Sequence, residues 1–195
     1  MRRALYIAIC LTLGTLGTNN PAQEPPDIHK LFAQLNELGT TDRAAIEILK
    51  AASEDTSARQ YIVRKLPGMI NKQKSEDEIW QNAVRLAGQL KASETIPPLL
   101  KALSLGPAGG PMNTTFGVQM RLDDDIVAKA LSQIGDPAVP AVTNLLKSGE
   151  RKARRRAVLI LLNMDSAASR KVLQDQVQRE TDPDLRDFIE RSLHS

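Results

Sequence analysis

The chain contains one cysteine, Cys10, which lies in an apolar segment at the N-terminus. If that segment is removed, no thiol remains in the chain. Disulfides, thiolate catalysis, zinc–thiolate sites and iron–sulfur clusters are then excluded. We therefore expect the fold to be stabilised by packing alone.

Aromatic residues make up only 3% of the chain, whereas apolar residues as a whole make up an ordinary 42%. A core of leucine, isoleucine, valine and alanine suits closely stacked helices, and disorder is not expected over most of the length. The single tryptophan, Trp80, is expected to pack against a neighbouring helix. The alternative is an exposed aromatic side chain that binds a partner.

Motifs of the common enzyme families are also missing. The two histidines, His29 and His194, lie near opposite ends of the chain, and no HExxH, GxSxG, Walker or GxGxxG motif occurs. We expect no catalytic residue, no cofactor and no metal site. A pair of helix-surface carboxylates of the glycosidase kind is a catalytic arrangement that the sequence leaves open.

The charge balance gives no argument for a nucleic-acid or membrane partner. The net charge is +3, but residues 1–22 contribute two arginines and no acid. Beyond them, 24 basic and 23 acidic residues remain, a net charge of +1. Because such a chain lacks the basic excess that binds phosphate backbones, we expect no nucleic acid.

Residues 1–22 have the pattern of a secretory signal peptide: Arg2 and Arg3, then an apolar stretch, then small residues that suit cleavage. The apolar stretch spans about 14 residues, fewer than the roughly 20 that a membrane-spanning helix needs. We expect export, to the periplasm or as a secreted protein, with no stable membrane span after cleavage. The alternative is an uncleaved N-terminal anchor. Residues 23–26 are then a linker, and 27–195 the folded domain.

Apolar residues beyond the linker recur at helical spacing, which predicts an all-α domain. In the clearest stretch, 128–163, one helix ends at Gly135, a second runs from Asp136 to about Ser148, and a third begins after Glu150. Turns this short require antiparallel neighbours. Earlier helices are expected over 27–38, from about Thr41, over 57–71 and over 75–91.

The same spacing predicts which side chains face inward. In the helix from Thr41 they are Ala45, Ile46, Leu49 and Ala52, and in 57–71 they are Ile62, Val63, Leu66 and Ile70. Pro67 lacks an amide N–H and is expected to kink or split its helix. Ser93 and Asp136 are expected to cap helices in which a proline follows four residues later.

Two helices near the C-terminus are similar to each other. Ala153-Arg154 followed by Ala157 matches Leu185-Arg186 followed by Ile189, at a separation of 32 residues. Self-similar helix pairs with a period of about 30 are typical of α-solenoids. The stretches IGDPAVPAVTNLLKSGERKARRRA (134–157), LKASETIPPLLKAL (90–103) and DPDLRDFIERSL (182–193) resemble the HEAT-repeat family.

The likeness is to the short bacterial HEAT-like repeats that phycobilisome lyases also contain, and it covers about residues 75–195. It implies an α-solenoid of antiparallel helix pairs. In the family, an arginine early in one helix often pairs with an aspartate of the adjacent turn. Arg154 and Arg186 occupy that place, whereas Trp80 and Val127 stand there in earlier repeats, so the resemblance implies an incomplete ladder of pairs.

A glycine- and proline-rich insertion, GPAGGPMNTTFGVQMRL at about 106–122, interrupts the period. Insertions in solenoids emerge on one face, often the binding face. Met112, Phe116 and Met120 are therefore candidate partner-binding residues. The alternative is a loop that is mobile or folds back on its own helices.

Asp123, Asp124 and Asp125 invite a cation-binding interpretation. Consecutive helical residues point about 100° apart, so three of them cannot all face one ion from a helix. We expect them to cap the following helix, where their charge meets the helix dipole favourably. A loop that arranges them around a cation stays open.

The densest basic cluster comprises Arg151, Lys152, Arg154, Arg155 and Arg156. Arg151, Arg154 and Arg155 share one helix face at spacings i, i+3 and i+4, and are candidate partner-binding residues for an acidic protein, a phosphate or an anionic headgroup. The alternative is a solvated face neutralised by acids of adjacent turns. Those acids are Glu150, Asp182 and Asp184.

These features together predict an exported binding or scaffold module that holds a protein partner and carries no catalysis. Two alternatives stay open. One is an enzyme or enzyme-accessory protein of the HEAT-like lyase type, and the other is a purely structural component of the cell envelope.

Overall fold

The computed structural model describes residues 27–35, 41–72, 78–104, 125–148 and 150–194. Every regular element within these ranges is a helix, so the prediction of an all-α chain is confirmed for them. The α-helices are α1 (Ile28–Gln34), α2 (Thr41–Glu54), α3 (Thr56–Lys72), α4 (Glu78–Gln89), α5 (Ile96–Ser104), α6 (Ile126–Ile134), α7 (Val139–Leu145), α8 (Arg151–Met164), α9 (Ala167–Val177) and α10 (Pro183–His194). Two 3₁₀ turns, η1 (Ser93–Thr95) and η4 (Asp136–Ala138), lead directly into α5 and α7.

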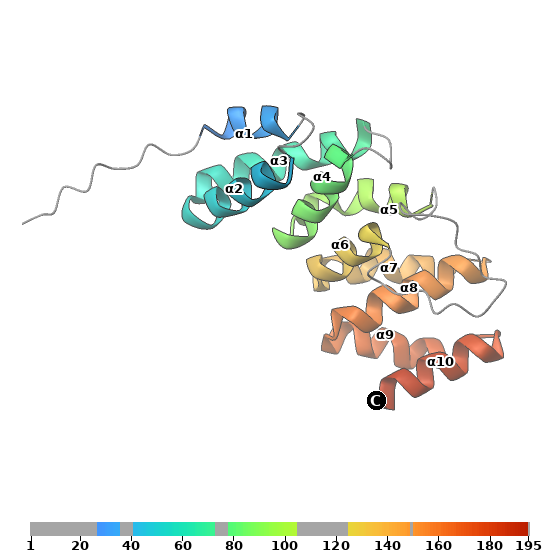
Figure 1. Cartoon of the computed structure of the whole chain (residues 1–195). Helices are drawn as coiled ribbons and strands as arrows, with labels where there is room; N and C mark the ends of the chain where they lie inside the picture. The colour runs from blue at the N-terminus through green and yellow to red at the C-terminus, as the bar shows by residue number, and fades with distance from the viewer. Residues whose placement is uncertain (1–26, 36–40, 73–77, 105–124, 149, 195) are drawn as a thin grey trace, which may run out of the picture.

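The helices pack in two rows, each made of alternate elements of the chain (Figure 1). In one row α2 contacts α4, α4 contacts α6, α6 contacts α8 and α8 contacts α10. In the other row α3 contacts α5, α5 contacts α7 and α7 contacts α9. Helices that follow one another, such as α2 and α3 or α7 and α8, join the two rows. Each interior helix therefore has packing neighbours along its row and across to the other row.

One hydrophobic core runs through both rows. Its largest fully buried side chains include Leu35, Ile48, Ile62, Leu66, Leu86, Leu99, Leu131, Ile160, Leu161, Leu173 and Ile189. The predicted inward face of 57–71 is confirmed, because the four side chains predicted to face inward are all buried: Ile62, Val63, Leu66 and Ile70. Each such side chain contributes about 1.5–3 kcal/mol relative to exposure to water, so packing alone supplies a substantial stabilisation.

Trp80 has the packing role that the sequence predicts. It lies in the first turn of α4, and only 3% of its surface is exposed. Its indole N–H donates a 3.0 Å hydrogen bond to the carbonyl oxygen of Ile70. A buried indole N–H needs such a partner, and this one fixes α4 against the last turns of α3.

Helices α4 and α6 pack closely where Gly88 of α4 faces Ala130 of α6. A Cβ atom placed on Gly88 would lie 2.8 Å from the Cα of Ala130 and would also meet the side chain of Gln133. Glycine costs helix stability of about 1 kcal/mol relative to alanine, but here a side chain would push two backbones apart. The glycine therefore sets the spacing of α4 and α6.

The stretch 128–163 folds as predicted. Helix α6 ends at Gly135, whose φ of 79° is a conformation that L side chains rarely adopt. Helix α7 follows after η4, and α8 begins at Arg151, immediately after Glu150. Helix α8 contacts both α6 and α7, and η4 lies between α6 and α7 and contacts both.

Three local predictions need correction. In α2 the predicted Ala52 is buried and the predicted Ala45 and Leu49 pack half-buried against the core, but Ile46 is 64% exposed, and Ala44, Ile48 and Ala51 complete the buried stripe. Of the two outcomes expected for Pro67, a split helix is wrong, since α3 runs without a break from Thr56 to Lys72. Ser93 and Asp136 do not cap α-helices. Each instead begins a 3₁₀ turn and makes no side-chain capping bond to it.

Candidate functional site

The predicted partner-binding residues fall in two places. Met112, Phe116 and Met120 lie outside the residues that the structure describes, as do Asp123 and Asp124. Arg151, Arg154 and Arg155 all lie in the first turns of α8. The structure gives these three arginines quite different surroundings.

Arg151 is held by two acids of the turn before α10 and of its first residues. Its Nε lies 2.5 Å from Oδ2 of Asp182, and its Nη2 lies 2.8 Å from Oδ2 of Asp184. A hydrogen bond to Asp184 and the charge of Asp182 raise the pKa of the Arg151 guanidinium. Because the arginine and Asp184 are exposed, water and salt screen this cluster, and it contributes little to stability.

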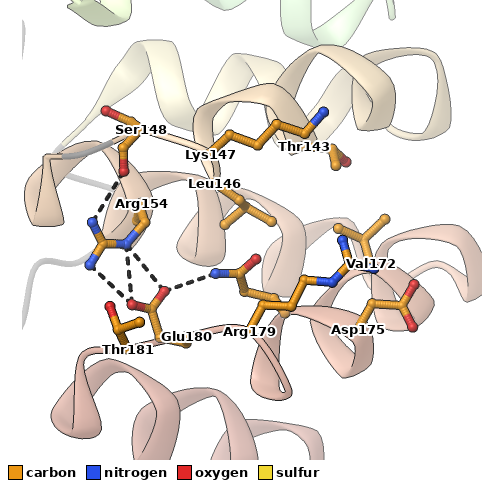
Figure 2. A pocket seen from close by; sticks show the side chains of 11 residues that line it. Thr143, Leu146, Lys147, Ser148, Arg154, Val172, Asp175, Arg179, Glu180 and Thr181 are labelled. Carbon is orange, nitrogen blue, oxygen red and sulfur yellow. Dashed lines mark hydrogen bonds and ion pairs between the residues drawn. The ribbon is translucent and has the colours of Figure 1, made fainter.

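Arg154 makes a more enclosed ion pair with Glu180, in the turn between α9 and α10 (Figure 2). Its Nη2 lies 3.0 Å from Oε1 of Glu180, and its Nε lies 3.2 Å from both carboxylate oxygens. A further N–H donates to the carbonyl oxygen of Ser148, 3.1 Å away. The side chain of Glu180 is 1% exposed and that of Arg154 is 14% exposed. Most donors of this guanidinium are therefore occupied within the chain.

The surroundings of Glu180 favour its ionised form. Burial opposes its charge and alone raises its pKa, but hydrogen bonds from Arg154, from the backbone N–H of Asp182 and from Gln176 outweigh burial, so the pKa lies below its ordinary value. The N–H of Asp182 is 3.1 Å from Oε1, and Nε2 of Gln176 is 2.9 Å from Oε2. The pair thus joins α8, the end of α9 and the start of α10.

Arg155 is the member of the predicted trio that remains available. It is half-buried, and it makes no hydrogen bond or ion pair with any other described residue. Lys152, one turn earlier, is exposed. On this face of α8, Lys152 and Arg155 are therefore the cations without an acidic partner among the described residues, whereas Arg151 is exposed but paired with Asp182 and Asp184.

The fourth arginine of this run, Arg156, is a residue whose role the sequence reasoning missed. It belongs to the predicted surface cluster, yet its side chain is only 6% exposed. Its Nη2 lies 2.5 Å from Oδ2 of Asp125, its Nε lies 3.0 Å from the same oxygen, and Nη1 donates to the carbonyl oxygen of Leu103. The signal that could have revealed it is the helical period, because Ala153, Arg156 and Ile160 lie on one stripe.

Both carboxylate oxygens of Asp125 accept hydrogen bonds within the chain. Its Oδ1 accepts a hydrogen bond from the backbone N–H of Ala128, 3.1 Å away, and so caps α6. Its Oδ2 accepts from Arg156. The predicted capping role is confirmed for this aspartate. Within the described ranges, no group of three or more histidine, cysteine or acidic side chains is placed to hold a metal ion.

A pocket of about 480 Å³ lies beside the Arg154–Glu180 pair, between α7 and α9 (Figure 2). The turn after α7 supplies Leu146, Lys147 and Ser148, and α9 with the turn after it supplies Val172, Asp175, Gln176 and Arg179. Its volume falls within the range of small-ligand pockets. Local sequence patterns do not predict that the turn after α7 and helix α9 face one pocket.

None of the helices in the described ranges is both long enough and apolar enough to cross a bilayer. Comparisons of the chain with protein-family models, with curated proteins and with solved structures return no match.

Proposed function

We propose that the protein is an exported α-solenoid of HEAT-like repeats that binds a protein partner and carries no catalysis. The observation that carries this proposal is the two-row packing, in which a helix contacts the helix two places before it and the helix two places after it. Repeat proteins are built in this way, because each unit buries its apolar face only against its neighbours. Their product is an extended surface, which suits recognition of another macromolecule.

Three of the hydrogen bonds between helices share one sequence separation, which supports the repeat assignment. Arg59 donates to the carbonyl oxygen of Leu90, Arg156 binds Asp125, and Arg151 binds Asp182. Each of these pairs is separated by 31 residues. This interval agrees with the 32-residue spacing of the matching sequence stretches. A period of this size is that of a two-helix unit.

The partner-binding surface in this proposal includes Lys152 and Arg155 on α8, with Met112, Phe116 and Met120 of the insertion as further candidates. Arg154 stays a candidate at the edge of the pocket, although Glu180 engages it. Arg151 stays one at the exposed rim, although Asp182 and Asp184 neutralise it. Positive charge on this end of the array favours an acidic partner.

Affinity capture tests the binding function. The chain from residue 27 onward, tagged at its C-terminus, is expected to retain one stoichiometric protein from an envelope extract. Lys152→Glu with Arg155→Glu is expected to weaken that retention about tenfold, because the free cations of α8 are reversed. Arg43→Glu with Lys50→Glu on α2 is the charge-matched control. Retention of no partner, or equal retention by both variants, would contradict the proposal.

Export is tested separately by cell fractionation and N-terminal sequencing. The expected result is a periplasmic or secreted chain that begins near residue 23. A cytoplasmic chain that still begins at Met1 would remove the export part of the proposal and leave the binding part standing.

A further inference from the structure

The pocket between α7 and α9 carries two cations that no acid of the described chain neutralises. Lys147 donates only to the side-chain oxygen of Asn144, at 3.4 Å, and Arg179 makes no side-chain hydrogen bond or ion pair with a described residue. Both line the pocket, Lys147 from the α7 side and Arg179 from the α9 side (Figure 2). An anion in the pocket would therefore meet a positive charge on each side.

The neighbouring arginine cannot take that role. Arg154 also lines the pocket, but its guanidinium already serves Glu180 and the carbonyl oxygen of Ser148. This enclosed pair closes one end of the pocket (Figure 2). The positive charges that a ligand can use are consequently those of Lys147 and Arg179 and not that of Arg154.

The lining between the two cations is partly apolar. Leu146 is buried and Val172 half-buried, and both line the pocket. Asp175, in the last turns of α9, and Arg179, in the turn after that helix, both line the pocket, and no ion pair joins them. A ligand that suits this lining carries an anionic group next to an aliphatic group.

We propose that this pocket binds an acidic segment of the protein partner. A carboxylate side chain lies between Lys147 and Arg179, and an adjacent aliphatic side chain packs on Leu146 and Val172. This inference rests on the proposed function and names the chemistry of the partner. A peptide fits better than a membrane surface, because the two cations line a concave pocket, which a single side chain can enter and a flat sheet of headgroups cannot.

Fluorescence anisotropy with a labelled Gly-Leu-Glu-Leu-Gly peptide tests the assignment. The folded chain is expected to bind it, and Lys147→Glu with Arg179→Glu is expected to weaken binding at least about tenfold, or about 1.4 kcal/mol. Replacing the glutamate of the peptide with glutamine is expected to weaken binding similarly. Arg43→Glu with Lys50→Glu on α2, which makes the same change in net charge, is expected to change affinity less than about twofold, as expected for charges beyond the screening distance.

A gain of affinity makes the test independent of folding defects. Asp175→Asn removes a negative charge from the pocket lining and is expected to tighten binding of the anionic peptide about twofold to threefold. A damaged fold cannot produce that change. Circular dichroism of each variant checks that the helices are retained.

Three results would overturn the assignment. One is peptide affinity that is undetectable, or that is unchanged in the Lys147/Arg179 variant. Another is binding of inorganic phosphate, or of vesicles that contain phosphatidylglycerol, through these two residues without binding of the peptide. The third is equal capture of the cellular partner by the wild-type chain and by the pocket variant, which leaves the binding function standing. Capture of no partner by either chain would count against the function, while the peptide titration still reports on the pocket.

Discussion

Arg156 of α8 and Asp125 at the start of α6 form an ion pair inside the protein, with Nη2 and Oδ2 separated by 2.5 Å. The pair is 31 residues apart in sequence and joins consecutive helices of one row. The same guanidinium reaches the carbonyl oxygen of Leu103, near the end of α5. One side chain therefore connects three helices.

Removing this arginine is expected to destabilise the fold strongly. Arg156→Met keeps an apolar stem but leaves the Asp125 carboxylate buried without its partner, which costs about 3–5 kcal/mol. Urea unfolding measures the loss. Arg186→Met on the exposed side of α10 is the control and is expected to change stability by less than about 0.5 kcal/mol. Adding Asp125→Asn to Arg156→Met should recover part of the loss, since the buried charge is then gone. A loss below about 1 kcal/mol in the single variant would contradict the buried pair.

The close contact of Gly88 with Ala130 predicts that alanine substitutions at two helical glycines, Gly88 and Gly68, change stability in opposite directions. Gly88→Ala is expected to destabilise the protein by about 1–2 kcal/mol, because overpacking against the α6 backbone exceeds the gain in helix propensity. Gly68→Ala in α3, where a Cβ would meet nothing within 4 Å, is expected to stabilise it by up to about 1 kcal/mol. Thermal unfolding of both variants decides the matter. Equal shifts of the two melting temperatures would show that α4 and α6 are not in close contact.

The Arg154–Glu180 pair predicts how stability depends on pH. Because folding lowers the pKa of Glu180 below its ordinary value of 4.5, its contribution is present above that pH and is lost as the pH falls through the folded-state pKa. Glu180→Gln is expected to cost about 1–3 kcal/mol at about pH 7, since Arg154 loses its charged partner. The difference between the two proteins should shrink as the pH falls below the ordinary value and through the lowered pKa of Glu180.

Urea unfolding at several pH values measures this difference. Asp184→Asn, which alters an acid that is 82% exposed, serves as the control and is expected to have little effect at any pH. A cost of Glu180→Gln that stays constant from neutral to acid pH would argue against an ionised, hydrogen-bonded carboxylate at this position.

The structure bears out the sequence where a local signal and the packing agree. Gly135 ends α6 because its backbone conformation favours glycine, and the inward face of 57–71 is clear because its apolar residues form one stripe. In α2 two stripes compete, one through Ile46 and one through Ile48. Only the contacts of α2 with α1, α3 and α4 select Ile48.

The site was harder to predict than the fold, for a physical reason. Local sequence shows Arg154, Arg155 and Arg156 as three equivalent charges. Their roles differ because Glu180 and Asp125, which are 26 and 31 residues away, reach two of them and not the third. Predicting the pocket also requires the long-range contacts, since Lys147 and Arg179 line one pocket only because α7 contacts α9.

The hydrogen bonds of Arg156 to Leu103 and Asp125 also indicate where a reporter can be inserted into the chain. Both groups bind one guanidinium, so the end of α5 and the start of α6 are held together at one point. The entropic cost of closing a loop grows only slowly with its length. The fold should therefore accommodate a fluorescent protein or an epitope tag inserted between Leu103 and Asp125, and loss of partner capture by such an insertion would report on the binding role proposed for Met112, Phe116 and Met120.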